Sequence, residues 1–175
     1  TDAFTLMLSQ PAVDEKVLLT VVREISRAAG SAGMAGGQAL DLVSAGRQID
    51  YPTLRAMHKA KTGALFRAAI RAGAILAGGT EPQIAGLTAY AEQFGLAFQI
   101  TDDILDVAGD QKNTGKPVGS DERNNKATYV SEFSLPEARQ RAANAVNEAL
   151  QAIKFFGPEA DVLREAVRYL ISRDR

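Results

Sequence analysis

The sequence contains no cysteine and only one histidine, His58. Without cysteine the chain can form no disulfide, no thiolate nucleophile and no thiolate metal site, which fits a reducing compartment. A single histidine excludes metal sites built on two or more imidazoles. His58 lies beside Lys59 and Lys61 without a nucleophile-elbow glycine pattern, which argues against a Ser-His-Asp triad. We therefore expect a cytoplasmic protein whose chemistry uses other groups.

An excess of charge of one sign and a long hydrophobic run are also missing. The net charge is −1, so no basic field argues for binding to nucleic acid or to an anionic membrane. The most apolar stretch, residues 62–79, is interrupted by Arg67 and Arg71 and is shorter than the ~20 apolar residues that span a bilayer. We expect no membrane span. The sequence leaves open whether these two arginines, four apart on one helix face, contact solvent or another subunit.

The sequence does contain helical periodicity almost throughout, with apolar residues recurring at spacings of three and four. Helices are predicted over residues 2–10, from the N-cap Asp14 to about Gly30, over 51–79, from Pro82 to about Val107, from Pro136 to about Ile153, and from Val162 to Leu170. A further helix, which carries Gln38 and Asp41, follows a glycine-rich join. No strand-like alternation of useful length appears. Residues 1–175 are therefore predicted to belong to one all-α domain.

The segment FGLAFQITDDILDVAGD, residues 94–110, places four aspartates in an otherwise apolar helix. When the helix is wound at about 100° per residue, its polar side chains fall within a stripe roughly 100° wide. This acidic stripe consists of Glu92, Gln99, Asp102, Asp103, Asp106 and Asp110. Because the other sides of the helix are apolar, protein should surround it. We expect the stripe to face an internal cleft.

Carboxylates one and four residues apart on a helix repel each other unless protons or cations neutralise them. An oxygen-only set of this kind suits Mg²⁺, which takes one or two carboxylates and completes its shell with water and substrate phosphate. The alternative is that the acids pair with lysines and arginines of neighbouring helices, or point into solvent near the helix end. The spacing does not match an EF-hand loop.

Basic residues that could balance a metal and diphosphate site occur in two places. A polar loop over residues 108–126 contains glycines that permit close backbone approach. Its basic residues are Lys112, Lys116, Arg123 and Lys126. In the preceding long helix, Lys61 and Thr62 place an ammonium beside a hydroxyl, a suitable pair for one phosphate. Gln38 and Asp41, three apart on one helix face, either support this site or simply pack against a neighbouring helix.

Together these motifs resemble the C-terminal part of the trans-isoprenyl diphosphate synthases, in particular the bacterial farnesyl and geranylgeranyl diphosphate synthases. The similarity covers essentially the whole chain, and its carriers are GMAGGQALDL, HKAKTGALFRAAIRAGAILAGG, FGLAFQITDDILDVAGD and NTGKPVGSDERNNKATY. The resemblance implies an all-α fold with helices around a central cavity, usually as a homodimer. It also implies a reaction in which an allylic diphosphate ionises and isopentenyl diphosphate attacks the resulting carbocation.

The resemblance implies a role for each matching position. The residues that match the metal-binding second aspartate-rich motif are Asp102, Asp103 and Asp106. The residues expected at the diphosphate are Lys61, Thr62, Gln99, Lys116, Lys126 and Gln38. Phe98 matches the aromatic residue beside the growing prenyl chain. The expected catalytic residues are Lys61, Asp102 and Asp103, and the expected cofactor is Mg²⁺, with Mn²⁺ as the alternative ion.

Two parts of the family pattern are missing from these 175 residues. They are a first aspartate-rich motif on an earlier helix, and the basic residues that bind isopentenyl diphosphate. Residues 2–10 also look helical without a preceding cap. We therefore expect a fragment that is inactive alone. The alternatives are a non-catalytic diphosphate-binding or regulatory subunit of a heteromeric synthase, and a related ionisation enzyme such as a terpene cyclase. Product chain length is left open.

Overall fold

The structure is a computed structural model that describes residues 2–108 and 126–172. Its elements are α1 (Asp2–Leu8), α2 (Glu15–Ala29), α3 (Met34–Ser44), α4 (Tyr51–His58), η1 (Lys59–Gly63), α5 (Ala64–Leu76), α6 (Glu81–Ala108), α9 (Tyr129–Phe133), α10 (Leu135–Ala152), η2 (Pro158–Ala160) and α11 (Asp161–Ser172). No strand occurs in these two ranges, and the predicted all-α class is confirmed. None of the helices described combines the length and hydrophobicity that crossing a bilayer would take.

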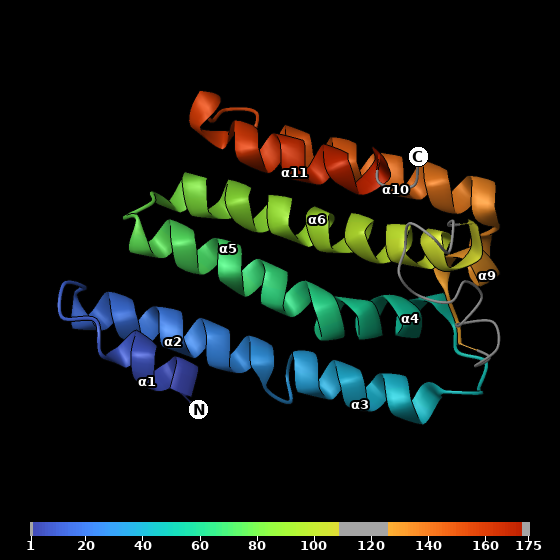
Figure 1. Ribbon diagram of the computed structural model, residues 1–175, viewed down its shortest axis with the longest axis horizontal. Coiled ribbons are helices and arrows are strands. Elements are labelled where there is room, and N and C mark those ends of the chain that lie inside the picture. The colour runs from blue at the N-terminus through green and yellow to red at the C-terminus, as the bar shows by residue number, and fades with distance from the viewer. Residues whose placement is uncertain (1, 109–125, 173–175) are drawn as a thin grey trace.

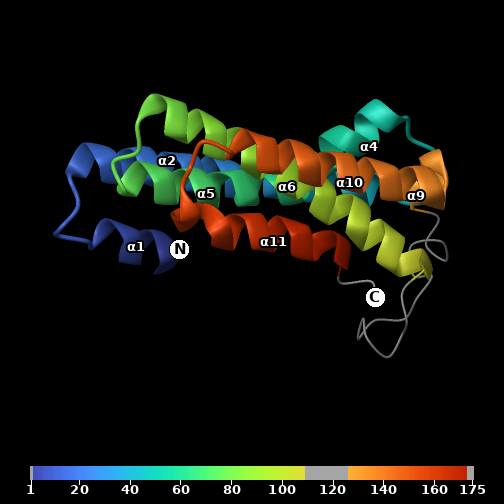
Figure 2. The ribbon, with the colours of Figure 1, turned by 90° about the horizontal axis from the view of Figure 1, so that it is seen from above.

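The helices lie side by side, and the chain reverses direction between successive layers (Figure 1). It runs one way through α2 and α3, returns through α4 and α5, and turns again into α6. Helices α10 and α11 cover the opposite edge from α2. In the view from above, α6 crosses obliquely, so that its first turns lie toward the side of α4 and its last turns toward that of α11 (Figure 2). Helix α6 therefore reaches both faces of the molecule.

The core lies on either side of α6, which packs against α5 and α10. Small side chains on one face of α10 are almost completely buried, and small residues at an interface let two helices approach closely. These are Ala138, Ala142, Ala145 and Ala149. From α6 they meet Tyr90, Ala97 and Ile100, each at most 1% exposed. The prediction that protein surrounds the apolar sides of this helix is confirmed along α10.

Helix ends follow the predicted caps closely. The Asp14 carboxylate accepts hydrogen bonds from the backbone N–H groups of Lys16 and Val17 at 2.9 and 3.2 Å, which starts α2 where the sequence predicts. Gly30 ends that helix. After α5, Gly78 adopts φ of 71°, a left-handed conformation that glycine reaches without steric cost. Capping chemistry is local, which is why the sequence alone is enough to place these boundaries.

The predicted continuous helix over residues 51–79 contains a π-helical turn, η1, that the sequence pattern does not show. Glycines on both neighbouring helices let their backbones come close to it. A Cβ added at Gly37 of α3 would lie 2.2 Å from the backbone nitrogen of Lys61. A Cβ at Gly95 of α6 would lie 3.1 Å from the Cα of Gly63. Single π-helical turns within α-helices are frequent at functional sites.

Arg71 fastens three helices together from inside the molecule. It donates hydrogen bonds to both carboxylate oxygens of Glu24 on α2, at 2.8 and 2.7 Å, and to the hydroxyl of Thr88 on α6, at 2.7 Å. The hydrogen bond with Arg71 lowers the pKa of Glu24. Arg71 thus follows neither alternative that the sequence left open, solvent or another subunit, because it contacts helices of its own chain. Arg67 is exposed.

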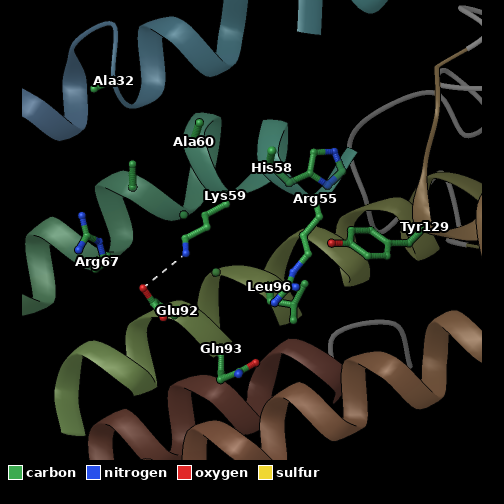
Figure 3. A pocket seen from close by; sticks show the side chains of 14 residues that line it. Ala32, Arg55, His58, Lys59, Ala60, Arg67, Glu92, Gln93, Leu96 and Tyr129 are labelled. Carbon is green, nitrogen blue, oxygen red and sulfur yellow. Dashed lines mark ion pairs between the residues drawn. The ribbon is translucent and has the colours of Figure 1, made fainter. Parts of the chain in front are cut away.

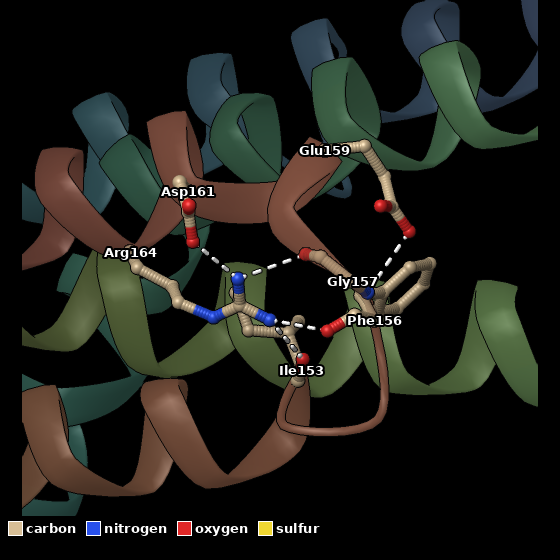
Figure 4. A network of polar contacts seen from close by, with 6 residues as sticks. All are labelled: Ile153, Phe156, Gly157, Glu159, Asp161 and Arg164. Atoms are coloured by element: carbon tan, nitrogen blue, oxygen red, sulfur yellow. Dashed lines mark hydrogen bonds and ion pairs between the residues drawn. The ribbon is translucent and has the colours of Figure 1, made fainter.

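The predicted break at residues 156–160 is confirmed, and Arg164 of α11 holds it (Figure 4). Its guanidinium donates to the backbone carbonyls of Gly157 at 2.9 Å, Phe156 at 2.6 Å and Ile153 at 3.3 Å. It also pairs with Asp161 at 2.6 Å. Carbonyl groups at a helix C-terminus have no partner within their own helix. Arg164 supplies that partner for the end of α10.

Candidate active site

The candidate site is centred on η1, which carries Lys61 and Thr62. Lys61 donates a hydrogen bond from Nζ to Oδ2 of Asp41 at 2.7 Å, and so joins η1 to α3. Thr62 donates from Oγ1 to Oε1 of Gln99 at 2.9 Å, and so joins η1 to α6. Both contacts are partly buried, so water screens them less than it screens surface pairs. Three helices thus bring an ammonium, a hydroxyl, an amide and a carboxylate into one region.

The polar face of α3 contributes to this region through Asp41. The Asp41 side chain is 15% exposed and pairs with Lys61, so it holds the lysine beside η1. Gln38, almost one turn earlier on α3, is exposed. Asp41 therefore contacts a residue that the resemblance places at the diphosphate, and its supporting role in the site stays a prediction. A substrate contact by Gln38 stays a prediction.

The structure does not gather the acidic stripe into one internal cleft. Asp103 is 4% exposed, and its Oδ2 accepts a hydrogen bond from the backbone N–H of Tyr129 at 2.7 Å. Asp102 is exposed, and Asp106 is half-buried. Because the stripe spans roughly 100° of the helix, its edges meet different neighbours. The expectation of a single internal cleft is corrected accordingly, and Asp110 lies outside the described residues.

The acidic residues suit an ion that is shared with a phosphate-bearing substrate. Residues 2–108 and 126–172 contain no group of three or more acidic or histidine side chains that could hold a metal. Asp102 and Asp106 stand four apart on α6, which places them one turn from each other. Mg²⁺ commonly takes only one or two carboxylates and obtains its other ligands from water and substrate phosphates. Asp102 and Asp106 therefore fit an Mg²⁺ ion that takes two carboxylates and obtains its other ligands from water and phosphate. Asp103 already accepts a hydrogen bond from the first residue of α9.

A hollow beside the end of α6 adds a basic residue to the site. Its volume is about 840 Å³, and its walls include Asp106 of α6 and Lys126. Lys126 also lines a small crevice with Asp41, the partner of Lys61. The structure therefore brings Lys126 to the region of η1, and its contact with a diphosphate stays a prediction. Lys116, the other predicted contact from the loop, lies outside the described residues.

Phe98 lies on α6 immediately before Gln99 and has aromatic neighbours. Its ring centroid is 5.2 Å from that of Phe66 on α5, and Phe66 is also 5.0 Å from Phe94. Phe98 packs against the core that α6 forms with α10 and α11. An apolar wall thus adjoins the polar residues of η1, which is the surrounding that a prenyl chain would need.

Sequence reasoning missed the role of Tyr129, which connects the acidic stripe of α6 to α9. Its backbone N–H binds Asp103, and its side chain is 0% exposed. The ring packs against those of Tyr51, His58 and Phe133. The only signal in the sequence is the TY of the K-x-TY motif, and this signal does not reveal a partner 26 residues away.

Protonation of His58 should weaken the folded state at acidic pH. Burial lowers the pKa of His58 from 6.5 to about 4; Asp41 raises it, whereas Lys61 and Lys126 lower it further. Below about pH 6.5 the unfolded chain takes up a proton that the folded chain rejects until about pH 4, so stability falls through this window. We expect a loss of about 2 kcal/mol between pH 7 and pH 5. Urea unfolding at both pH values should show it, and His58→Gln should not.

Comparison with known proteins agrees with this geometry. The sequence model described as polyprenyl synthetase matches residues 2–170. The farnesyl diphosphate synthase of Escherichia coli (strain K12) is 38% identical over 181 residues, which cover 100% of this chain and 60% of that protein. An FPP/GFPP synthase from Zymomonas mobilis gives a TM-score of 0.83 at 36% identity, covering 96% of this chain and 56% of the other.

A third comparison concerns a liganded structure. A geranyltransferase from Helicobacter pylori, solved in complex with magnesium and isoprenyl diphosphate, gives a TM-score of 0.79 at 27% identity. The match covers 98% of this chain and 56% of the other. These structures define the fold as that of an isoprenyl synthase.

The chain belongs to the polyprenyl synthetase family. Its relatives carry the names farnesyl diphosphate synthase, geranylgeranyl diphosphate synthase and dimethylallyltranstransferase, all of them prenyl transferases. The resemblance that the sequence motifs indicated is therefore confirmed. The chain spans about 60% of the length of the Escherichia coli relative.

Proposed function

We propose that the complete protein is a prenyltransferase that condenses an allylic diphosphate with isopentenyl diphosphate. The observation that carries the proposal is the arrangement at η1, where Lys61 and Thr62 are fixed by Asp41 and Gln99. The family membership supports it, as does the related geranyltransferase solved with magnesium and isoprenyl diphosphate. The homodimer implied by the resemblance and the cytoplasmic location expected from the lack of cysteine stay predictions.

Ionisation of the allylic diphosphate needs groups that bind the departing diphosphate and groups that hold the metal, and this chain offers both. Departure of diphosphate concentrates negative charge on its oxygens, which positive groups must stabilise. The ammonium groups of Lys61 and Lys126 would lie against these oxygens, and the hydroxyl of Thr62 would be oriented by Gln99. Asp102, with Asp106, would hold Mg²⁺, which when bound supplies further positive charge at the leaving group.

The remaining requirement is an apolar surrounding for the carbocation, because water would quench it. Phe98 and its aromatic neighbour Phe66 adjoin the polar residues and present such a surface. Lys61 and Thr62 also stand on a turn whose backbone is contacted from both sides by glycines. Groups held by neighbouring helices in this way keep their positions as charge develops, which is the condition for electrostatic catalysis.

The test is prenyl transfer by the intact protein, measured with geranyl diphosphate and isopentenyl diphosphate in the presence of Mg²⁺. We expect extraction of prenylated product to depend on the metal, and EDTA to abolish it because the leaving group would lose a major source of positive charge. Restoring Mg²⁺ should restore turnover. Mg²⁺-dependent binding of geranyl diphosphate without any product would contradict the proposal and favour a non-catalytic diphosphate-binding subunit.

A further inference from the structure

A second pocket lies between α4, η1 and the middle of α6, and is lined by other residues of η1 than Lys61 and Thr62 (Figure 3). Its volume is about 330 Å³, at the lower end of the range for sites that bind small molecules. Lys61, Thr62 and Gln99 do not line it, whereas Glu92, the first residue of the acidic stripe, does. The pocket is lined by Glu92, Gln93, Gly95 and Leu96 from the middle of α6, whereas Asp102 and Asp106 lie further along the same helix.

Three residues that line this pocket each carry a buried polar atom without a hydrogen-bond partner. Across residues 2–108 and 126–172, the buried side-chain atoms that lack one are His58 Nδ1, Gln93 Oε1 and Tyr129 Oη. All three residues line this one pocket. Leaving a buried donor or acceptor unpaired costs about 1–3 kcal/mol. Of the three, the Tyr129 hydroxyl is directed toward Arg55, another residue that lines the pocket (Figure 3).

Of these three unpaired groups, the hydroxyl of Tyr129 gives the strongest support for a ligand. Its side chain is 0% exposed, yet Figure 3 shows its hydroxyl pointing toward Arg55 and Leu96. Burial raises the pKa of the hydroxyl, which therefore keeps its proton and can donate a hydrogen bond. The charge of Arg55 acts on the same hydroxyl. A neutral donor and a guanidinium side by side make a suitable pair for an anion.

The rim of the pocket carries an excess of positive charge. Arg55, Lys59 and Arg67 line it, against a single acid, Glu92. Lys59 and Glu92 form an exposed ion pair at 3.8 Å, which screening makes weak. Neither Arg55 nor Arg67 forms an ion pair within the part of the chain that the structure describes. Two arginines are therefore available to an incoming negative charge.

The inner walls of the pocket are apolar. They are formed by Ala56 of α4, Ala60 of η1, Ala64 of α5 and Leu96 of α6. Small side chains here leave room for a compact hydrocarbon or aromatic body. A ligand that satisfies both the walls and the rim must combine an apolar body with an anionic head.

We propose that this pocket binds a small organic anion, with its carboxylate or phosphate head against Arg55 and the Tyr129 hydroxyl and its apolar body against Ala60 and Leu96. The site is separate from the proposed prenyl-transfer site and does not depend on it. Tyr129 nevertheless connects the two, because its backbone N–H donates to Asp103. A ligand in the pocket would therefore contact a residue that also holds the acidic stripe.

The test uses the intact protein, titrated by calorimetry with phenyl phosphate and with benzoate, which distinguish the two kinds of head group. We expect at least one of them to bind, and inorganic phosphate and benzyl alcohol to bind about tenfold or more weakly, since each supplies only half of the ligand. Tyr129→Phe and Arg55→Gln should each weaken binding by about tenfold, because each removes one hydrogen bond to a charged group. Arg168→Gln, an exposed arginine on α11, is the matched control and should bind normally.

Amide chemical shifts then locate the ligand. Changes at His58, Gln93 and Tyr129 support the proposal, whereas changes confined to Lys61 and Thr62 would place the ligand in the candidate active site and overturn it. Absence of binding by both probes would also overturn it and leave a pocket occupied by water. A thermal unfolding midpoint of Tyr129→Phe equal to that of the wild type excludes loss of folding as the cause of weaker binding. Prenyl transfer is measured separately, so failure of either proposal leaves the other intact.

Discussion

Replacing Asp102 by asparagine in the intact protein should lower the rate of prenyl transfer by about 100- to 1000-fold, the effect typical of losing one electrostatic contact to a transition state. Asp102 is exposed on the last turns of α6 and forms no hydrogen bond or ion pair with the described residues. Its charge therefore contributes little to folding. Its loss would remove an oxygen ligand from the proposed ion, and with it part of the charge that stabilises departing diphosphate.

Asp103→Asn tests whether Asp103 has a structural role that its neighbour Asp102 lacks. Asp103 is buried and accepts the backbone N–H of Tyr129 at 2.7 Å, a charge-assisted hydrogen bond that starts α9. We expect this substitution to lower the thermal midpoint as well as activity, whereas Asp102→Asn should lower activity alone. Asp2→Asn, an exposed acid on α1, serves as the control and should change neither. Near-normal turnover by Asp102→Asn would contradict the metal-binding role of the acidic stripe and favour a purely structural one.

Much of the fold could be predicted because its causes are local. The cap at Asp14, the glycine at the end of α5 and the apolar spacing of α6 each act within one or two turns of the residues that they organise. The family motifs likewise lie in short contiguous segments. Such features can be recognised in a sequence without knowing which helices become neighbours.

The π-helical turn and the division of the acidic stripe could not be predicted, because their causes are distant in the sequence. The turn at η1 is contacted by Gly37 of one helix and Gly95 of another. Asp103 turns toward the N–H of Tyr129, 26 residues further along the chain. Helical periodicity places a side chain on a face, but only the packing of the other helices decides what that face meets. The contact between Lys61 and Asp41, 20 residues apart, could not be predicted for the same reason.

Gly37→Ala should destabilise the protein and reduce its activity, because α3 packs closely against η1 at this glycine. The new Cβ would lie 2.2 Å from the backbone nitrogen of Lys61 and 2.6 Å from its Cα. These are backbone atoms and cannot rotate away as the end of a side chain can, so α3 and η1 must separate. Overpacking of this kind costs about 1–3 kcal/mol, sometimes more. The substitution should therefore lower the urea midpoint of unfolding.

The same separation should also reduce activity beyond what partial unfolding explains. Asp41 lies one turn from Gly37 on α3, so a displaced helix lengthens the 2.7 Å contact that holds the Lys61 ammonium. Gly73→Ala on α5 is the matched control, because its Cβ would meet nothing within 4 Å. Alanine in such a helical position should leave activity unchanged and raise stability by about 0.5–1 kcal/mol. If Gly37→Ala behaved like Gly73→Ala in both measurements, the close approach of α3 to η1 would not be what positions the Lys61 ammonium.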